Sequence, residues 1–282
     1  MLALLVSTPS LHPTQLAAGH ASRLISPLSG TAPCLVDFER SRCRPLPAMM
    51  AGGSDYLAER HDGDGRILVQ GGALRTWSYR SPAVQQIQVI LSSDGRPIDA
   101  DIELWNGPDN TPVKMRVYVE DGQLRPFSAT VETPRSPNTL AIRNIGQVEF
   151  PLAAKVLTPA VDSPSPECAT SAMTVQGGAL RTYPFDPTIN SIQILLKTDG
   201  RPLNARIELL QGPNNNKVVI ELYTEDGFDR PFFCILDTPG SGNVVRIVNT
   251  APVEFPMTAA VVPYEMAVVE DPAADVVLGG DP

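Results

Sequence analysis

Histidine is nearly absent from this chain of 282 residues. Its three histidines, His12, His20 and His61, all precede a long repeated region that contains none. Histidine is the most common general base, the centre of the Ser-His-Asp triad and the most common zinc ligand. The chain also lacks a Cys-x-x-Cys pair and a glycine-rich loop followed by Lys-Ser or Lys-Thr. We therefore expect that the protein is not an enzyme and has no catalytic, cofactor-binding or metal-binding residues.

Cysteines and long apolar runs are also scarce. The four cysteines, Cys34, Cys43, Cys168 and Cys234, form no pair that recurs along the chain. This pattern argues against a disulfide framework and suits a reducing compartment. We expect Cys234, which corresponds to Ala129 in the repeat described below, to be a small core residue. No stretch is long and apolar enough to cross a membrane, so we expect no membrane insertion.

Basic residues are outnumbered by acidic residues over most of the chain. The formal net charge is −9, and residues 1–54 carry four arginines and two acids, a balance of +2. The remaining residues therefore carry −11. A surface this acidic repels phosphate backbones, so we expect no nucleic acid among the partners.

The sequence contains two copies of one unit. The octapeptide Val-Gln-Gly-Gly-Ala-Leu-Arg-Thr stands at Val69–Thr76 and again, unchanged, at Val175–Thr182, 106 residues later. An identity of this length marks an internal repeat. After a deletion of one residue, six more motifs return in the same order: Asp-Gly-Arg-Pro (94–97 and 199–202), Ile-Glu-Leu (102–104 and 207–209), Gly-Pro (107–108 and 212–213), Glu-Asp-Gly (120–122 and 225–227), Arg-Pro-Phe (125–127 and 230–232) and Val-Glu-Phe-Pro (148–151 and 253–256).

Short strands are the elements that each copy predicts. Apolar and polar residues alternate along 100–105 and along 115–120, as in strands with one face in a core. We expect a first strand over Val69–Tyr79, a hairpin-type turn at Asp94-Gly95 and a second turn at Gly107-Pro108. Prolines (28) outnumber glycines (21), which disfavours long helices. The fold class is thus all-β, with two tandem homologous antiparallel β-sandwich-like or jelly-roll-like domains of about seven strands each.

The repeat divides the chain into five parts. Residues 66–157 and 173–262 are the two β-domains, and residues 158–172 are a linker rich in Pro, Ser and Ala. Residues 1–54 have the composition of an organelle transit peptide that is disordered or cleaved, since no acid precedes Asp37; a disordered tail without an address is the alternative. Residues 263–282 carry five acids and no base. They are either a solvated tail or a segment that docks on a neighbouring subunit by strand addition.

Aromatic and arginine side chains are expected on an outer face of the strands. If Ala100, Ile102 and Leu104 point inward, Trp105 points outward. Aromatic residues mixed with arginine are typical of an interface, although the same face could pack against the sister repeat or stack sugars. The candidate subunit-interface residues are Arg75, Trp77, Trp105, Tyr118, Arg181, Tyr183, Leu210 and Tyr223.

These motifs together resemble the pyrenoid shell proteins (PyShell) of diatoms and related algae. The resemblance covers roughly residues 67–262 and rests on Gly-Gly-x-Leu-Arg-Thr before Trp or Tyr, Asp-Gly-Arg-Pro, Ile-Glu-Leu-x-x-Gly-Pro, and Glu-Asp-Gly followed by Arg-Pro-Phe. It implies two β-domains related by a pseudo-two-fold axis. It also implies a structural protein that self-assembles into a sheet-like shell around the Rubisco-containing pyrenoid and supports CO2 concentration and carbon fixation.

The resemblance further implies partners and a location. The partners are copies of the chain itself, in a homo-oligomeric sheet or tube, with the Rubisco condensate or other shell paralogues as further candidates. The location is the chloroplast stroma at the pyrenoid periphery. One alternative is a two-module plastid carbohydrate-binding protein that uses Trp77 and Trp105. Another is a lyase or hydrolase on β-sandwiches, in which Tyr, Arg or Glu replaces the histidine base. We expect the acids that recur in both repeats, such as Glu103 and Glu208, to form turns or to pair with the recurring arginines, Arg75 and Arg181, Arg96 and Arg201, or Arg125 and Arg230.

Overall fold

Strands dominate the part of the chain that the structure describes. This computed structural model describes residues 65–158 and 161–266, so the leader and most of the acidic tail lie outside the described residues. The first repeat forms β1 (Ile67–Val69), β2 (Leu74–Tyr79), β3 (Gln86–Ser92), β4 (Ile98–Asn106), β5 (Asn110–Val119), β6 (Phe127–Glu132), β7 (Asn138–Asn144) and β8 (Leu152–Leu157). One short helix, α1 (Pro166–Thr170), follows. The second repeat forms β9 (Met173–Val175), β10 (Leu180–Pro184), β11 (Ile189–Lys197), β12 (Leu203–Gln211), β13 (Asn216–Thr224), β14 (Phe232–Asp237), β15 (Asn243–Asn249) and β16 (Met257–Met266).

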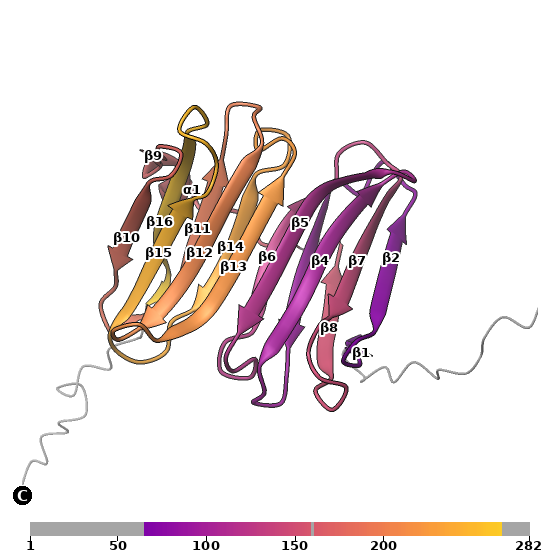
Figure 1. Cartoon of the computed structure of the whole chain (residues 1–282), viewed down its shortest axis with the longest axis horizontal. Coiled ribbons are helices and arrows are strands. Elements are labelled where there is room, and N and C mark those ends of the chain that lie inside the picture. The colour runs from indigo at the N-terminus through magenta and orange to yellow at the C-terminus, as the bar shows by residue number, and fades with distance from the viewer. Residues whose placement is uncertain (1–64, 159–160, 267–282) are drawn as a thin grey trace, which may run out of the picture. The chain divides into compact units, whose positions relative to one another are not determined.

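Two eight-stranded antiparallel sheets contain all of these strands (Figure 1). The first sheet, called sheet A here, has the order β1-β8-β3-β6-β14-β11-β16-β9. The second, sheet B, has the order β10-β15-β12-β13-β5-β4-β7-β2. Each repeat contributes four neighbouring strands to each sheet, and its eight strands have the order of a jelly roll. The prediction of an all-β, sandwich-like fold is therefore confirmed.

The predicted first strand is divided into two, which explains why each repeat has eight strands and not about seven. Gly71 and Gly72 lie between β1 in sheet A and β2 in sheet B, and the chain changes sheets there. Gly72 has a φ of 78°, which favours glycine. A Cβ atom on Gly71 would lie 1.9 Å from the carbonyl oxygen of Gln147, so no larger residue fits without a shift of the backbone.

The Asp94-Gly95 turn also differs from the prediction. It connects β3 of sheet A to β4 of sheet B, and these two strands do not pair with each other. Gly95 has a φ of 68°, as a tight turn requires, but this turn crosses the sandwich and does not close a hairpin. In contrast, the turn at Gly107-Pro108 joins β4 to β5, which pair with each other, so a hairpin is formed there.

The two repeats are joined strand to strand along both sheets. In sheet B, β5 pairs with β13, and Arg116 lies opposite Glu221, its own counterpart in the second repeat. In sheet A, β6 pairs with β14, and Ala129 likewise lies opposite its counterpart Cys234. We call these two strand pairs the seam. The repeats therefore share two continuous sheets and are not two separate sandwiches.

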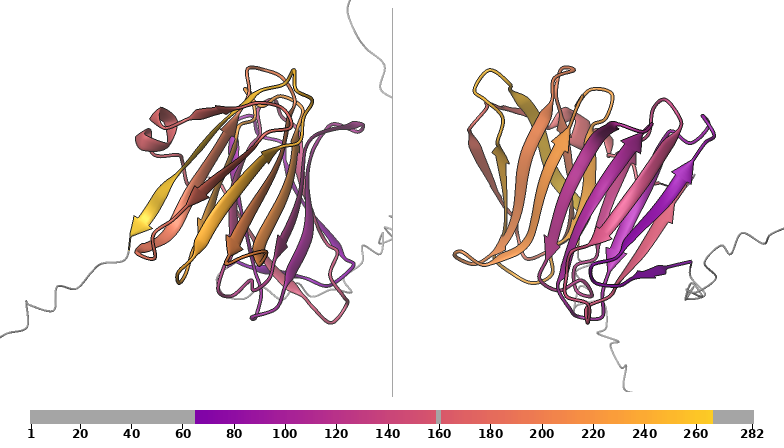
Figure 2. Two further views of the ribbon diagram at one scale, coloured as in Figure 1. Left: turned by 60° about the vertical axis from the view of Figure 1, so that its left-hand side comes forward. Right: turned by 45° about the vertical axis from the view of Figure 1, so that its right-hand side comes forward.

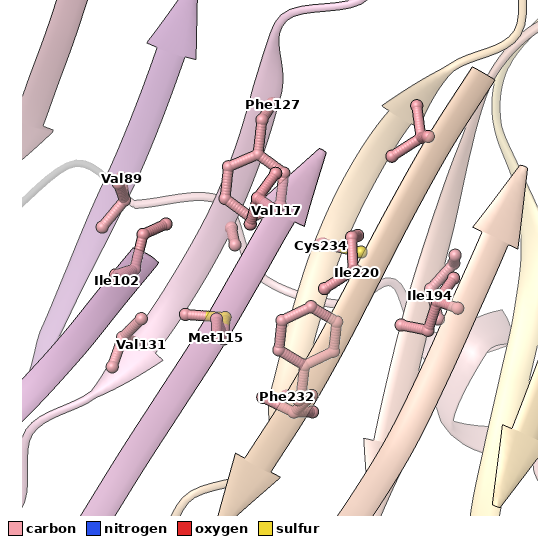
Figure 3. Close-up of a cluster of buried hydrophobic side chains, with 14 of the residues drawn as sticks. Val89, Ile102, Met115, Val117, Phe127, Val131, Ile194, Ile220, Phe232 and Cys234 are labelled. Carbon is pink, nitrogen blue, oxygen red and sulfur yellow. The ribbon is translucent and has the colours of Figure 1, made fainter. Parts of the chain in front are cut away.

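The hydrophobic core continues across the seam. Alternate residues of each strand point between the sheets: in β4, Ile102 and Leu104 are buried whereas Asp101 and Glu103 are half-buried. Figure 3 shows side chains of both repeats gathered in this core, among them Phe127 from β6 and Phe232 from β14. Cys234 is fully buried in the same cluster, which confirms its prediction as a core residue.

The linker is more ordered than its composition suggested. Ser165 caps α1, because its hydroxyl accepts a hydrogen bond from the backbone N–H of Cys168, and Pro166 and Glu167 occupy the first turn. The last strand is also longer than predicted. β16 continues through Met266, with Glu265 opposite Ser191, so the first four residues of the predicted tail belong to sheet A.

Candidate interaction surface

The outer face of sheet B carries most of the charged side chains near the seam. Glu208 on β12 accepts hydrogen bonds from Arg206 (2.8 Å) and from Arg246 on β15 (3.1 Å). Arg206 also pairs with Glu221 on β13 at 3.2 Å. The recurring acid Glu208 thus has an ion-pairing role, as the sequence predicted, but its partners Arg206 and Arg246 are not the predicted Arg181, Arg201 or Arg230. Because Glu208 is almost fully buried and both arginines are only partly exposed, the network fixes the positions of these charges on the face.

A hollow of about 470 Å³ lies on this face at the seam. Acidic and basic side chains alternate around it, and both repeats contribute to it. The residues that line it include Asp101, Glu103, Lys114, Arg116, Arg206 and Glu221. Burial raises the pKa of Asp101, and the charges of Asp99 and Glu103 act in the same direction, whereas Arg116 opposes them. A hollow lined by charges of both signs suits contact with a polar surface.

Polar contacts across the seam hold the two repeats in register. Lys217 pairs with Glu120 at 2.5 Å, and the buried Arg125 donates to the side-chain oxygen of Gln211 at 2.9 Å. Burial lowers the pKa of Arg125, the nearby acids counteract this shift, and its Nε atom has no hydrogen-bond partner. These contacts belong to the fold of a single chain.

Tyr118 and Tyr223 lie on the predicted outer face. They are 38% and 37% exposed, and they flank the Arg116–Glu221 pair on β5 and β13. Trp105 lies on the same face, but its indole N–H donates to Glu103 at 2.8 Å and the ring is half-buried. Leu210 is only 5% exposed. The two tyrosines are therefore accessible, whereas neighbouring side chains cover Leu210 and part of Trp105.

The other four candidates lie on the edge strands of sheet B, on the side that faces the core, and two of them pack against it. Trp77 on β2 and Tyr183 on β10 are half-buried and pack against the core, so their predicted outward orientation was wrong. Burial raises the pKa of Tyr183. The reason is that the turn at the paired glycines sets which side of each strand faces the core, and the alternation then places Arg75, Trp77, Arg181 and Tyr183 on the inner side.

The sequence did not predict that the linker covers part of the outer face of sheet A. The linker crosses this face: Gln88 on β3 donates to Asp162 (2.5 Å), and Gln193 on β11 donates to Ser165 (2.7 Å). Cys168 of α1 packs in a second apolar cluster with Leu195, Phe233 and Ala260. Burial raises the pKa of the Cys168 thiol to about 11. The Ser165-Pro166-Glu167 sequence, an N-cap followed by proline, is the signal that would have indicated this helix.

Among residues 65–158 and 161–266, no three His, Cys, Asp or Glu side chains are grouped so that they could hold a metal ion. Within the same ranges, no helix is long and apolar enough to span a membrane. Cys168 and Cys234 are both buried free thiols.

The fold and its surface define a tandem jelly-roll protein with a charged outer face on sheet B, whose outermost strands are β2 and β10. The chain belongs to the diatom pyrenoid shell protein family, because the model of that family matches residues 61–263. This match confirms the family resemblance predicted from the motifs. No curated protein matches the sequence.

Some solved structures share a partial likeness with the chain. The oxalate decarboxylase of Bacillus subtilis at pH 4.6 is 9% identical, over 70% of this chain and 69% of that chain, with a TM-score of 0.19. The infectious bursal disease virus Gx strain is 12% identical, over 76% of each chain, with a TM-score of 0.14. Likenesses with such low TM-scores carry no argument about the fold or function of this chain.

Proposed function

We propose that this protein is a structural subunit that self-assembles into a sheet-like shell around the Rubisco-containing pyrenoid. Membership of the pyrenoid shell family is the observation that carries the proposal. On this proposal the chain acts in the plastid stroma, at the pyrenoid periphery, and supports CO2 concentration and carbon fixation. Its partners are copies of itself, with the Rubisco condensate or other shell paralogues as further candidates.

The arrangement of the repeats supports a subunit of an extended array. We infer a pseudo-two-fold axis at the seam, because Arg116 lies opposite Glu221 and Ala129 lies opposite Cys234, each residue facing its counterpart. Such an axis gives one chain two similar ends that face away from each other. Contacts between the two different ends of successive copies propagate as an open array when they do not close into a ring.

A structural role, and not an enzymatic one, also fits the charged groups. The repeated region has no histidine. The acid Glu208, which recurs as Glu103 in the first repeat, is held between two arginines and is not left free for proton transfer. Charged side chains fixed in this way are suited to positioning a neighbouring surface.

Electron microscopy of the purified full chain tests the proposal directly. We expect negative staining across a salt series to show flat sheets, tubes or rolled lattices, and the assembled fraction to change with salt because the exposed faces are charged. A monodisperse monomer or dimer under every condition would contradict self-assembly.

The alternative of a carbohydrate-binding protein loses support from the positions of the tryptophans. Trp77 packs against the core, and Trp105 is half-buried and bonded to Glu103, so neither presents an open ring for a sugar. We expect no retention of the full chain on glycan affinity columns. Specific retention that free sugar reverses would favour the carbohydrate-binding function.

A further inference from the structure

We propose that copies of this chain join edge to edge, with β2 of one copy paired antiparallel to β10 of the next, so that sheet B continues from copy to copy. The inference rests on the proposed function, because it specifies which surface joins the subunits. β2 and β10 are the two outermost strands of sheet B, at opposite ends of the two-repeat sandwich (Figure 1). Figure 2 shows both of these edges from other directions.

The octapeptide that is identical in both repeats supplies the first three residues of each of these two edge strands, after the turn from sheet A. Part of the identity is required by the fold. Val69 and Val175 are buried in the core, and a Cβ atom on Gly177 would lie 1.8 Å from the carbonyl oxygen of Pro252, much as at Gly71. These positions have the same residue because each repeat makes the same turn from sheet A to sheet B.

The fold of a single chain does not explain why the exposed residues of the octapeptide are also identical. Leu74 and Leu180 are 38% and 51% exposed, and Thr76 and Thr182 are exposed as well. Packing inside the sandwich does not require a leucine or a threonine at an exposed position of an edge strand. A contact in which β2 of one copy pairs with β10 of the next would require the same residues on both strands.

The backbone of both edges is suited to pairing. The N–H of Asn144 donates to the carbonyl of Ala73, and the N–H of Asn249 donates to the carbonyl of Ala179, both at 3.0 Å. Because backbone groups alternate in direction along an antiparallel strand, Thr76 and Thr182 direct their N–H and C=O groups away from the sheet. An edge strand whose N–H and C=O groups point away from its own sheet is a template for another strand.

The geometry favours a contact between β2 of one copy and β10 of the next. Each pair of neighbours in sheet B is antiparallel, so its first and eighth strands, β10 and β2, run in opposite directions. A translation along the sheet therefore brings β2 of one copy antiparallel to β10 of the next, with the same face outward. Within a single chain, β5 and β13 already form an antiparallel pair of this type between the two repeats.

One register uses the side chains of both edges. If Thr76 lies opposite Thr182 of the next copy, these two residues exchange both of their backbone hydrogen bonds. In that register Trp77 faces Arg181 of the next copy, and Arg75 faces Tyr183. Arginine beside an aromatic ring is a favourable pairing. Pro184, which has no N–H, then faces Leu74 at the end of the ladder, where only one hydrogen bond is lost.

The apolar surroundings of β10 support the same partner. A hollow of about 630 Å³ lies between β9 and β10, and Met173, Leu180 and Tyr183 are among the residues that line it. Met173 is half-exposed there, in contact with Arg181 at 3.7 Å. An apolar hollow beside a free strand is a surface that an adjoining copy would cover.

Two lysine substitutions test the contact. We expect Leu74→Lys or Leu180→Lys in the full chain to abolish sheets in negative-stain micrographs and to give monomers in sedimentation, since each places a charge at one of the two edges. Leu124→Lys is the control, because Leu124 is as exposed as Leu180, at 51%, but lies in the turn between β5 and β6. Circular dichroism of each variant checks that the fold is retained.

Mixing the two variants identifies the pair of edges. The Leu180→Lys variant retains an intact β2, and the Leu74→Lys variant retains an intact β10, so we expect the mixture to give a one-to-one dimer that grows no further. A dimer formed by either variant alone would overturn the proposal, because it would mean that like edges meet. Sheets from both variants, equal to those of the wild type, would overturn the edge contact and leave shell formation standing. A wild-type chain that never assembles would overturn both.

Discussion

Replacing Phe232 with alanine is expected to lower the free energy of unfolding by about 3–5 kcal/mol, the usual cost of removing a buried phenylalanine ring. Phe232 is 3% exposed and belongs to the core cluster that includes residues of both repeats. The two tryptophans, Trp77 and Trp105, are both in the first repeat, whereas Phe232 is in the second. Because the core is continuous across the seam, the effect of the substitution should reach the tryptophans.

The measurement is urea denaturation followed by tryptophan fluorescence and by far-ultraviolet circular dichroism. We expect a single transition in both signals, shifted together to lower urea by Phe232→Ala. Phe228→Ala is the matched control, since Phe228 is 73% exposed in the same repeat and should change the midpoint little. A fluorescence transition that stays in place while circular dichroism becomes biphasic would mean that the repeats unfold independently.

Replacing Gly177 with alanine is expected to destabilise the protein by roughly 3 kcal/mol or more, since overpacking against the backbone cannot be relieved by rotating a side chain. The added Cβ would lie 1.8 Å from the carbonyl oxygen of Pro252, and the chain changes sheets at this point. The turn between β9 and β10 must therefore move away from the loop that precedes β16.

A second glycine separates this steric effect from the effect of backbone conformation. Gly107 has a φ of 75°, but a Cβ atom there would have nothing within 4 Å. Gly107→Ala should therefore cost only about 1 kcal/mol, the strain of an alanine in the left-handed region. Thermal unfolding of the two variants gives the comparison, and equal losses would contradict the steric explanation.

The strands were predictable from the sequence because alternation is a local signal. In β4 and β5 every second residue is apolar and buried, as the sequence indicated. The sheet to which a strand belongs is not local information. Asp94-Gly95 is a turn dipeptide whether it closes a hairpin or crosses the sandwich, and only the pairing of β3 with β6 and β8 distinguishes the two.

The candidate surface was predictable only in part, for the same reason. Tyr118 and Tyr223 alternate with buried neighbours, and their exposure follows from that pattern. Trp77 and Tyr183 alternate with exposed residues as well, but the side of the strand that faces the core depends on the turn at the paired glycines. The seam could not be read from sequence, because the pattern of β5 is the same whether β13 lies beside it or not.

The path of the linker makes the two surfaces of an edge-joined row different in local symmetry. On sheet B, Tyr118 and Tyr223 present the same group from each repeat. On sheet A, the linker covers Leu195 and Phe233 of the second repeat, whereas the corresponding residues of the first repeat are Ile90 and the polar Ser128. In a row of such chains, the outer face of sheet B would therefore keep the pseudo-two-fold relation between the repeats, whereas the linker breaks that relation on the outer face of sheet A. Surface images of the two sides would differ in this local two-fold symmetry.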